Sequence, residues 1–571
     1  MTKSMWPIPE VGVPAEERDR AVLHSTLWAA AADALGWITE LSYGEKGVVR
    51  RTGATRVSHP VPWRRVIGGR GGPQVRLPAG TYSDDTQLRL GVSRAIRGDG
   101  TFDVEAFAKI EMTVWPTYAL GAGLGSKAAA ANLARRGVNW FSNFYDGARQ
   151  KYVFGGGNGA AMRIQPHVWS SAGSSEVLVA DVFRNAIVTH GHAHGFCGAI
   201  FHALSLDDAI RQRTISSPNG WSAYLDRCVE LSRIMDGEPQ LSTFWLSEWE
   251  TKAGITLKDA VTKFRDEGNR DIDLVQGVRS GSPLERYREV LNKLGCLTPQ
   301  YRGSGWKTSL AALSLAYFFR EDEIENALLT SANELESDTD TIGTMAGALL
   351  GATANRSPEW PVQDCVYLAR EARRLSSVAR GEAQDSFSYP DLGHWAPPRK
   401  QYEAMGTFGN GLAMAGLGEL QTHGEEYSSK GLVWQWCEFA FGQNVLAKRK
   451  TGVSSHIAPG QLPGERQKAP ATSRGTGVAD AKKPSVSGEL FRDEHTDVGL
   501  RMPVGRKDDT TQVVAGTVDA WTDEAILSNF DDRVLGRMLN RCIDASRSVE
   551  AAMGFAAIIA KAKLARMKRR R

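Results

Sequence analysis

Residues 336–343, with the sequence ESDTDTIG, lead directly into TMAGALLG at residues 344–351. The second segment consists of small and apolar residues, which favours a helix that packs deep in a protein core. The start of that helix would place Asp338, Asp340 and Thr341 near the centre of the protein. Buried charge is unfavourable unless it is paired or binds a cation. We therefore expect these oxygen atoms to hold a hard cation.

The composition is typical of a globular protein with a large core. Of the 571 residues, 42% are hydrophobic and 23% are charged, and the length predicts a catalytic core with appended segments. The six cysteines form no CxxC pair, which argues against a zinc site or a disulfide framework. Because no apolar run reaches membrane-spanning length and the N-terminus does not resemble a signal peptide, we expect a cytoplasmic protein without membrane contact.

The positive charge of the chain is concentrated at its C-terminus. The last eleven residues contain seven lysines and arginines and no acid. Without those seven charges the formal net charge changes from +4 to −3. A basic tail of this kind either binds nucleic acid through phosphate contacts, or solvates the last helix or binds an acidic protein.

Two acids accompany the first predicted helix. Apolar residues recur at helical spacing over residues 21–41, and Asp33 and Glu40, seven positions apart, share one face. Asp33 lies among alanines, where it either contributes to chemistry or caps a neighbouring loop. Glu40 lies nearer the helix end and is the better candidate for catalysis.

A second predicted helix runs to Ile96 and begins at SDDT, residues 83–86. Ser83 or Asp84 could be its N-cap, and acids in a first turn suit the helix dipole. Capping accounts for one aspartate but leaves the adjacent Asp85 unexplained.

Residues 154–163, with the sequence FGGGNGAAMR, form a glycine-rich segment. Glycine permits close backbone approach, so successive N–H groups there could cradle a diphosphate; alternatively, the segment is a flexible turn. The glycine spacing is not GxGxxG and strands do not alternate with helices around it, which excludes a Rossmann motif. Residues 303–308, GSGWKT, do not form a Walker A loop because the residue directly before the lysine is tryptophan and not glycine.

Three histidines alternate over residues 190–194. A transition-metal site would need all three on one side, which only an extended strand provides, and the residues that follow favour a helix. His190 is better interpreted as a polar wall of a ligand pocket.

Helical patterns dominate the chain and strand signals are sparse, so we predict an all-α core. The predicted domains are a catalytic domain at residues 20–384, an aromatic and glycine-rich flap or helical extension packed on it at 385–450, a disordered linker at 451–489, and a C-terminal helical segment with the basic tail at 490–571. Residues 45–80, rich in glycine, arginine and proline, should form loops and a short hairpin.

Four of these motifs, in this order over roughly residues 20–360, resemble the motifs of the ADP-ribosylglycohydrolase family. They are DALG at residues 33–36 with Glu40, SDDT at 83–86, GNGAAMR at 157–163 and DTDTI at 338–342. Ala32 stands where the family usually has glycine, and Ser83 stands where it usually has threonine.

The resemblance implies a compact, orthogonal multi-helix all-α core with a C-terminal helical extension. It also implies a centre of two Mg²⁺ ions, with Mn²⁺ as a substitute, in a cleft. The residues that would supply metal ligands are Ser83, Asp84, Asp85, Asp338, Asp340 and Thr341. The implied catalytic residues are Glu40 and Asp85. The implied substrate-binding residues are Gly155, Gly156, Gly157, Asn158, Gly159 and His190.

The implied function is metal-dependent hydrolysis of the C1″ glycosidic bond between ADP-ribose and a protein or small-molecule acceptor. One alternative is a non-catalytic sensor of ADP-ribose or nucleotide. Another is a hydrolase directed to ADP-ribosylated nucleic acid by the basic tail. The sequence does not select arginine, serine, a base or an O-acyl group as the acceptor, because loops such as 41–80 and 296–308 would recognise it.

Overall fold

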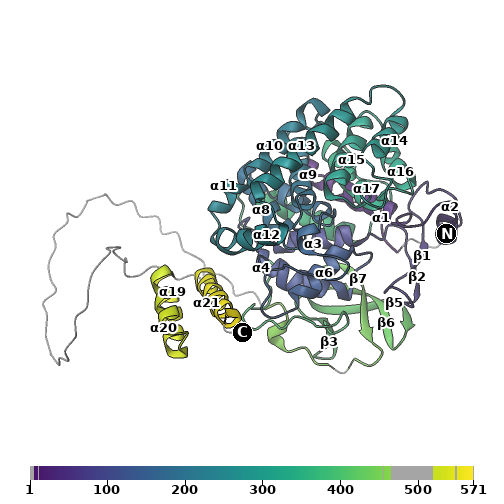
Figure 1. Ribbon diagram of the computed structural model, residues 1–571. Helices are drawn as coiled ribbons and strands as arrows, with labels where there is room; N and C mark the ends of the chain where they lie inside the picture. Colours follow the sequence, from purple (N-terminus) through teal and green to yellow (C-terminus); the bar gives the residue numbers. More distant parts are fainter. Residues whose placement is uncertain (1–4, 11, 454, 465–517, 547–548, 570–571) are drawn as a thin grey trace, which may run out of the picture. The chain divides into compact units, whose positions relative to one another are not determined.

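The computed structural model describes residues 5–10, 12–453, 455–464, 518–546 and 549–569 (Figure 1). The chain forms two compact units, Met1–Gly464 and Glu465–Arg571. No helix within the described ranges is long and apolar enough to cross a membrane.

The first unit is predominantly helical, as the sequence predicts. Its α-helices are α1 (Glu17–Trp37), α2 (Glu45–Thr52), α3 (Asp84–Ala95), α4 (Val104–Ala106), α5 (Met112–Val114), α6 (Leu124–Leu133), α7 (Gln165–Trp169), α8 (Ser175–Ile187), α9 (Ala193–Gln212), α10 (Ser222–Val229), α11 (Leu231–Asp236), α12 (Leu246–Ala253), α13 (Leu257–Gln276), α14 (Pro283–Lys293), α15 (Gly305–Phe318), α16 (Ile324–Asn333), α17 (Thr339–Thr353) and α18 (Cys365–Ala379). Its strands are β1 (Trp63–Val66), β2 (Gln74–Leu77), β3 (Met405–Phe408), β4 (Gly411–Met414), β5 (Gly418–Ser429), β6 (Leu432–Phe439) and β7 (Asn444–Lys450).

Helices α1 and α17 pack closely along a stripe of small residues. Gly343, Gly347 and Gly351 lie four positions apart on α17, and all three face α1. A Cβ atom at Gly347 would lie 2.7 Å from the carbonyl oxygen of Trp28, and one at Gly351 would lie 2.7 Å from that of His24. Because the obstructing atoms belong to the backbone of α1, the two helices can approach this closely only with glycine at Gly347 and Gly351.

This packing aligns the end of α1 with the start of α17. The side chain of Thr339 donates to the carbonyl oxygen of Gly36 at 2.8 Å, and a Cβ atom at Gly36 would overlap the backbone of Thr339. The residues that follow α1 therefore lie beside the first residues of α17.

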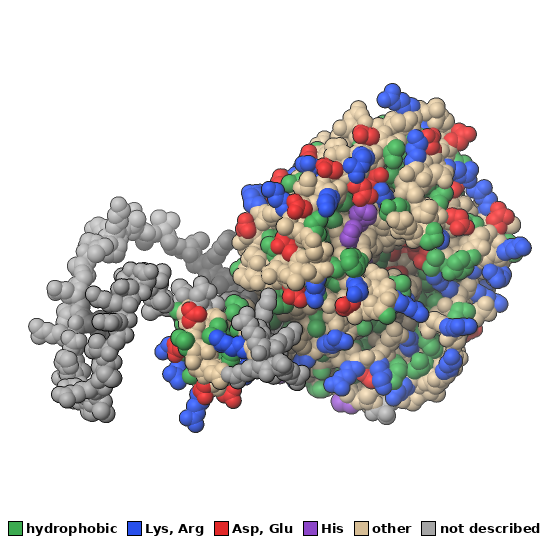
Figure 2. Space-filling view, viewed as in Figure 1, with side chains coloured by type: hydrophobic (Ala, Val, Ile, Leu, Met, Phe, Trp, Pro, Cys, Tyr) green, Lys and Arg blue, Asp and Glu red, His purple; other side chains and the backbone are tan. Residues whose placement is uncertain are grey.

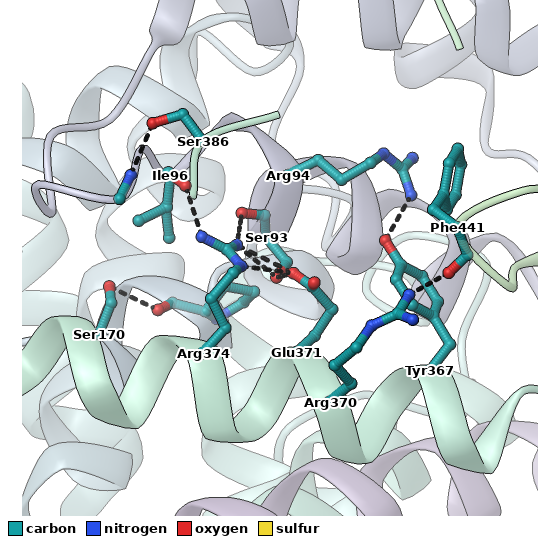
Figure 3. A network of polar contacts seen from close by, with 12 residues as sticks. Ser93, Arg94, Ile96, Ser170, Tyr367, Arg370, Glu371, Arg374, Ser386 and Phe441 are labelled. Carbon is teal, nitrogen blue, oxygen red and sulfur yellow. Dashed lines mark hydrogen bonds and ion pairs between the residues drawn. The ribbon is translucent and has the colours of Figure 1, made fainter. Parts of the chain in front are cut away.

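Helix α18 joins α3 to the C-terminal sheet through polar contacts (Figure 3). Arg374 donates to the carbonyl oxygen of Ile96 and to the carboxylate of Glu371, each at 2.9 Å. One turn away, Arg370 donates to the carbonyl oxygen of Phe441, between β6 and β7. Because the charge of the partly buried Arg374 requires such partners, these contacts help to fix the position of α18.

Residues 405–450 form a five-stranded antiparallel sheet in the order β3-β4-β5-β6-β7. Of the two alternatives expected for 385–450, the helical extension is therefore wrong for residues 405–450. The sheet is difficult to predict from the sequence because β6 is buried at most positions, so polar and apolar residues do not alternate along it. Glycines with positive φ at Gly409, Gly416 and Gly431 make the turns between strands. By contrast, the hairpin expected within residues 45–80 is confirmed as β1 and β2.

The predicted linker at 451–489 is partly ordered. Ile457 and Leu462 are buried against Ala413 of β4, and His456 pairs with Thr407 of β3. Ile457 and Leu462, two apolar residues in an otherwise polar segment, pack residues 455–464 against the sheet. Residues 465–489 lie outside the described part of the chain.

The described residues of the second unit form α19 (Val518–Leu527), α20 (Asp532–Ser546) and α21 (Val549–Arg569), within the segment expected to be helical at 490–571. They enclose a small apolar core of their own, made of Trp521, Ala525, Phe530, Met538, Cys542, Phe555 and Ile559.

Substitution of Gly347 by alanine tests the contact between α1 and α17. The added Cβ atom would meet rigid backbone, so we expect the free energy of unfolding to fall by about 1–3 kcal/mol. Chemical denaturation monitored by circular dichroism provides the measurement. The matched control is Gly343→Ala on the same helix, where the nearest atom would be 3.4 Å away. Equal effects of the two variants would contradict close packing at Gly347.

Candidate active site

A cavity of about 890 Å³ opens where the end of α1 and the starts of α3 and α17 meet. Its volume lies within the range typical of small-molecule sites. Figure 2 shows the hollow on this face of the first unit, with histidine side chains close by. Most of the predicted site residues line the cavity: Glu40, Asp84, Asp85, Gly156, Gly157, Asn158, Gly159, His190, Asp338, Asp340 and Thr341. Ser83 and Gly155 do not line it.

The first turn of α3 is held in place by Asp33 of α1. The carboxylate of Asp33 accepts from the backbone N–H of Ser83 at 3.0 Å and from that of Thr86 at 2.9 Å. Of the two roles considered for Asp33, the structure shows the cap of a neighbouring loop. Ser83 is the N-cap of α3, and its hydroxyl accepts from the N–H of Asp85 at 3.2 Å. Asp84 and Asp85 then face the cavity.

Four aspartates share this cavity with little access to water. Burial, followed by repulsion from Glu40, raises the pKa of Asp84 to about 7. Burial and the neighbouring carboxylates raise the pKa of Asp85 and of Asp340 well above the usual range, and the pKa of Asp338 is raised as well. Such a cluster is unfavourable without positive charge.

The donor atoms fit a hard cation. Asp85 Oδ2 is buried without a hydrogen-bond partner, and the hydroxyl of Thr341 lies 3.5 Å from Asp85 Oδ1. Within the described residues, no three His, Cys, Asp or Glu side chains are arranged to hold a metal ion by themselves. Hydroxyl oxygens and water would have to complete the coordination, which suits Mg²⁺ or Mn²⁺ better than zinc.

The turn before α17 is braced from the opposite wall. Arg302 donates to the carbonyl oxygens of Leu335 and Ser337 at 2.9 and 3.0 Å. Asn158 donates its amide to Asp338 Oδ2 at 2.9 Å, which links the glycine-rich loop to this turn. Asn158 thus orients one of the predicted metal ligands.

The glycine-rich loop is shaped by His190. A Cβ atom at Gly157 or Gly159 would lie 3.3 or 3.0 Å from the imidazole ring of His190. In this loop the N–H groups of Gly155, Gly156 and Asn158 already donate to backbone carbonyl oxygens. The predicted diphosphate cradle would therefore have to use the other N–H groups of the loop.

Glu40 lies at the cavity wall, held by a residue of the β1–β2 hairpin. Arg65 Nη2 lies 2.8 Å from Glu40 Oε2, and the two side chains are only 16% and 21% exposed. The guanidinium group of Arg65 lies over the rings of Trp37 and Trp63, 5.2 and 5.8 Å from their centroids. These contacts fix the orientation of the Glu40 carboxylate.

The family model described as ADP-ribosylglycohydrolase matches residues 14–383. The chain belongs to the ADP-ribosylglycohydrolase family. It is similar to the ADP-ribosyl-[dinitrogen reductase] glycohydrolase of Rhodospirillum rubrum, with 26% identity over 286 residues, which are 50% of this chain and 72% of that protein. Among solved structures it matches a chain titled "ADP-ribosylglycohydrolase-related protein complex", at 19% identity and a TM-score of 0.37, over 64% of this chain and 99% of that one. The protein is thus a glycohydrolase of the ADP-ribosyl class.

His190, His192 and His194 all line the cavity but differ in their partners. Burial lowers the pKa of His190 to about 3 and that of His192 to about 4, so both rings are neutral at pH 7. The ring of His190 is hydrogen bonded to the hydroxyl of Thr189 at 2.7 Å. The place of His190 in the cavity lining agrees with its interpretation as a polar wall of a ligand pocket.

One network of hydrogen-bonded side chains beside the cavity was not predicted from the sequence. His194 contacts Ser304 Oγ through Nδ1 and Glu267 through Nε2, each at 3.0 Å. Glu267 also pairs with Lys307 at 3.1 Å, and Lys307 pairs with Asp271 at 2.5 Å. The only hint in the sequence is the spacing of Glu267 and Asp271, four apart on one helix face. Arg65 gave no hint, because it is one of many arginines in its segment.

Replacement of Glu267 by glutamine tests this chain through the pH dependence of stability. Hydrogen bonding from His194, together with Lys307, lowers the pKa of Glu267 from 4.5 to about 2. The folded state therefore binds fewer protons than the unfolded state between these values, so the stabilisation is complete above pH 4.5 and is lost as pH falls towards 2. Because the side chain is about one-third exposed, we expect a loss of only about 1–2 kcal/mol at pH 7.

Urea denaturation from pH 7 to pH 2.5 measures the effect. The difference between the original protein and Glu267→Gln should shrink as the pH falls. Asp273→Asn, an exposed change on the same helix, should have little effect throughout. A difference for Glu267→Gln that does not vary with pH would exclude the ion pair as its cause.

Proposed function

We propose that this glycohydrolase uses bound divalent cations to hydrolyse the C1″ bond between ADP-ribose and an acceptor, reversing ADP-ribosylation. The observation that carries the proposal is the convergence of Asp84, Asp85, Asp338 and Asp340 on one cavity, with Glu40 at its wall.

The cations would be two Mg²⁺ ions, with Mn²⁺ as a substitute. The residues that would hold them are Ser83, Asp84, Asp85, Asp338, Asp340 and Thr341. When bound, these ions supply positive charge that offsets the carboxylates and fixes the ribose hydroxyls of the substrate. Ser83 is the weakest member of this set, because its buried hydroxyl already caps α3.

Glu40 would act on the reacting bond. Glycoside hydrolysis passes through a transition state resembling an oxocarbenium ion, and carboxylates commonly assist by positioning water or moving a proton. Arg65 keeps the Glu40 carboxylate in one orientation towards the cavity. Asp85, with one oxygen atom lacking a partner, is the second catalytic candidate. His190 and the glycine-rich loop would contact the rest of the ADP-ribose.

The acceptor would be an ADP-ribosylated protein or small molecule. A panel of ADP-ribosylated arginine, serine, nucleobase and O-acyl substrates, each with and without Mg²⁺, tests the proposal. Binding of ADP-ribose without hydrolysis of any acceptor in Mg²⁺ or Mn²⁺ would favour the alternative, a sensor.

Replacement of Asp338 by asparagine should abolish metal-dependent turnover and weaken Mn²⁺ binding by at least about 100-fold, because it removes a charged oxygen ligand. Titration calorimetry with Mn²⁺ measures binding independently of activity. Asp391→Asn, an exposed aspartate remote from the cavity lining, is the control. Activity retained in Asp338→Asn would refute this ligand assignment.

Replacement of Arg65 by glutamine should lower kcat by about 10- to 100-fold with little change in KM, because the orientation of Glu40 is lost while the substrate contacts remain. Arg65→Lys, which keeps the positive charge, should recover part of kcat. Arg56→Gln, an exposed arginine of the same segment, should have no effect. A rise in KM alone would assign Arg65 to substrate binding instead of positioning.

A further inference from the structure

The β1–β2 hairpin has a second face that the proposed reaction does not use. Along β1, Trp63 and Arg65 point inward, where Arg65 binds Glu40, whereas Arg64 is exposed. In the antiparallel register Arg64 lies directly opposite Arg76 of β2, which is also exposed. Like charges directly opposite each other destabilise a hairpin. Neither arginine forms an ion pair within the described part of the chain.

The hairpin lies in a segment of strongly positive charge. Residues 45–76 contain eight lysines and arginines and a single acid, Glu45. Among the ion pairs of the described residues, this segment contributes one, between Arg65 and Glu40. The charge on the outer face is therefore available to an external anion.

The C-terminal sheet adds to the same surface. The hydroxyl of Ser429 donates to the carbonyl oxygen of Gly71 at 2.8 Å, and a Cβ atom at Gly71 would meet the ammonium group of Lys430. This brings Lys430, in the turn between β5 and β6, beside the loop that carries Arg70. Figure 1 places β1, β2, β5 and β6 together, and Figure 2 shows many Lys and Arg side chains on that flank.

An aromatic side chain accompanies these cations. Tyr427 of β5 lies close enough to Arg76 for the guanidinium charge to act on its hydroxyl. The acids nearby are already engaged: Glu425 accepts from the Tyr427 hydroxyl, and Glu426 pairs with Arg449. Arginines, a tyrosine and the loop GGRGG at residues 68–72 are features of surfaces that bind single-stranded nucleic acid.

We propose that Arg64, Arg70, Arg76 and Lys430 form a binding surface for the phosphate backbone of a single-stranded nucleic acid. Arginine favours phosphate because its planar group donates two parallel hydrogen bonds. Arg65, one residue from Arg64, binds Glu40, so a strand bound here lies on the same short hairpin that holds the proposed catalytic carboxylate. That the bound strand is the acceptor rests on the proposed hydrolase function, whereas binding itself does not.

The test measures binding of a fluorescent 12-nucleotide single-stranded oligonucleotide to the full-length protein at several salt concentrations. In Arg64→Gln/Arg76→Gln we expect affinity at low salt to fall by about 10-fold. The slope of log affinity against log salt should fall by about 1.4, since each phosphate contact on a single strand contributes about 0.7. Lys258→Gln/Arg279→Gln removes two exposed, unpaired charges on and just after α13 and should leave the slope unchanged.

Three results would overturn the proposal: no binding, an unchanged slope in Arg64→Gln/Arg76→Gln, or equal binding of polyglutamate, which indicates an acidic protein partner. A loss of binding only in Lys563→Gln/Arg566→Gln would move the contact to the C-terminal helices. Hydrolysis is measured separately on an ADP-ribosylated oligonucleotide. If no acceptor is cleaved, the hydrolase proposal fails while the binding result stands.

Discussion

The site depends on how closely α1 and α17 approach each other. Glycines at four-residue intervals on α17 leave no side chain between the two helices, so the backbone of α1 packs directly on that of α17. At one end of this contact the hydroxyl of Thr339 donates to the carbonyl oxygen of Gly36. The C-terminal end of α1 therefore lies beside the N-terminal end of α17. Glu40, just after one helix, and Asp338 and Asp340, at the start of the other, face the same cavity because of this packing.

Around that contact, hydrogen bonds hold an arrangement of charges that would otherwise repel each other. Asp33 braces α3 from beneath, Arg302 braces the turn before α17, and Asn158 holds Asp338. Each of these groups contacts backbone or a single carboxylate oxygen, and Asp85 Oδ2 remains buried without a hydrogen-bond partner. These contacts fix the positions of the acids, and the cations proposed for the site would supply the positive charge that offsets them.

Much of this site could be predicted from the sequence, because acids and glycines in short motifs depend little on distant residues. Asp84, Asp340 and Asn158 lie where their motifs placed them, and the helical core follows from periodicity. Arg65 and Glu267 could not be predicted, since their roles arise from contacts with residues far away in the chain. The sheet at 405–450 could not be predicted either. A strand such as β6 is buried at most positions, so its sequence lacks the alternation of polar and apolar residues by which strands are predicted.

The two faces of the β1–β2 hairpin have different surroundings, because Arg65 contacts Glu40 at the cavity whereas Arg64 is exposed. In an extended strand neighbouring side chains face opposite ways, so Arg64 can be exchanged without moving Arg65. Related proteins could therefore differ in the exposed side chains of β1 and β2 while keeping the same inward-facing side chains. For protein engineering, the exposed side chains of this hairpin can be redesigned to change which molecules the enzyme binds, because the inward-facing Arg65 still holds Glu40.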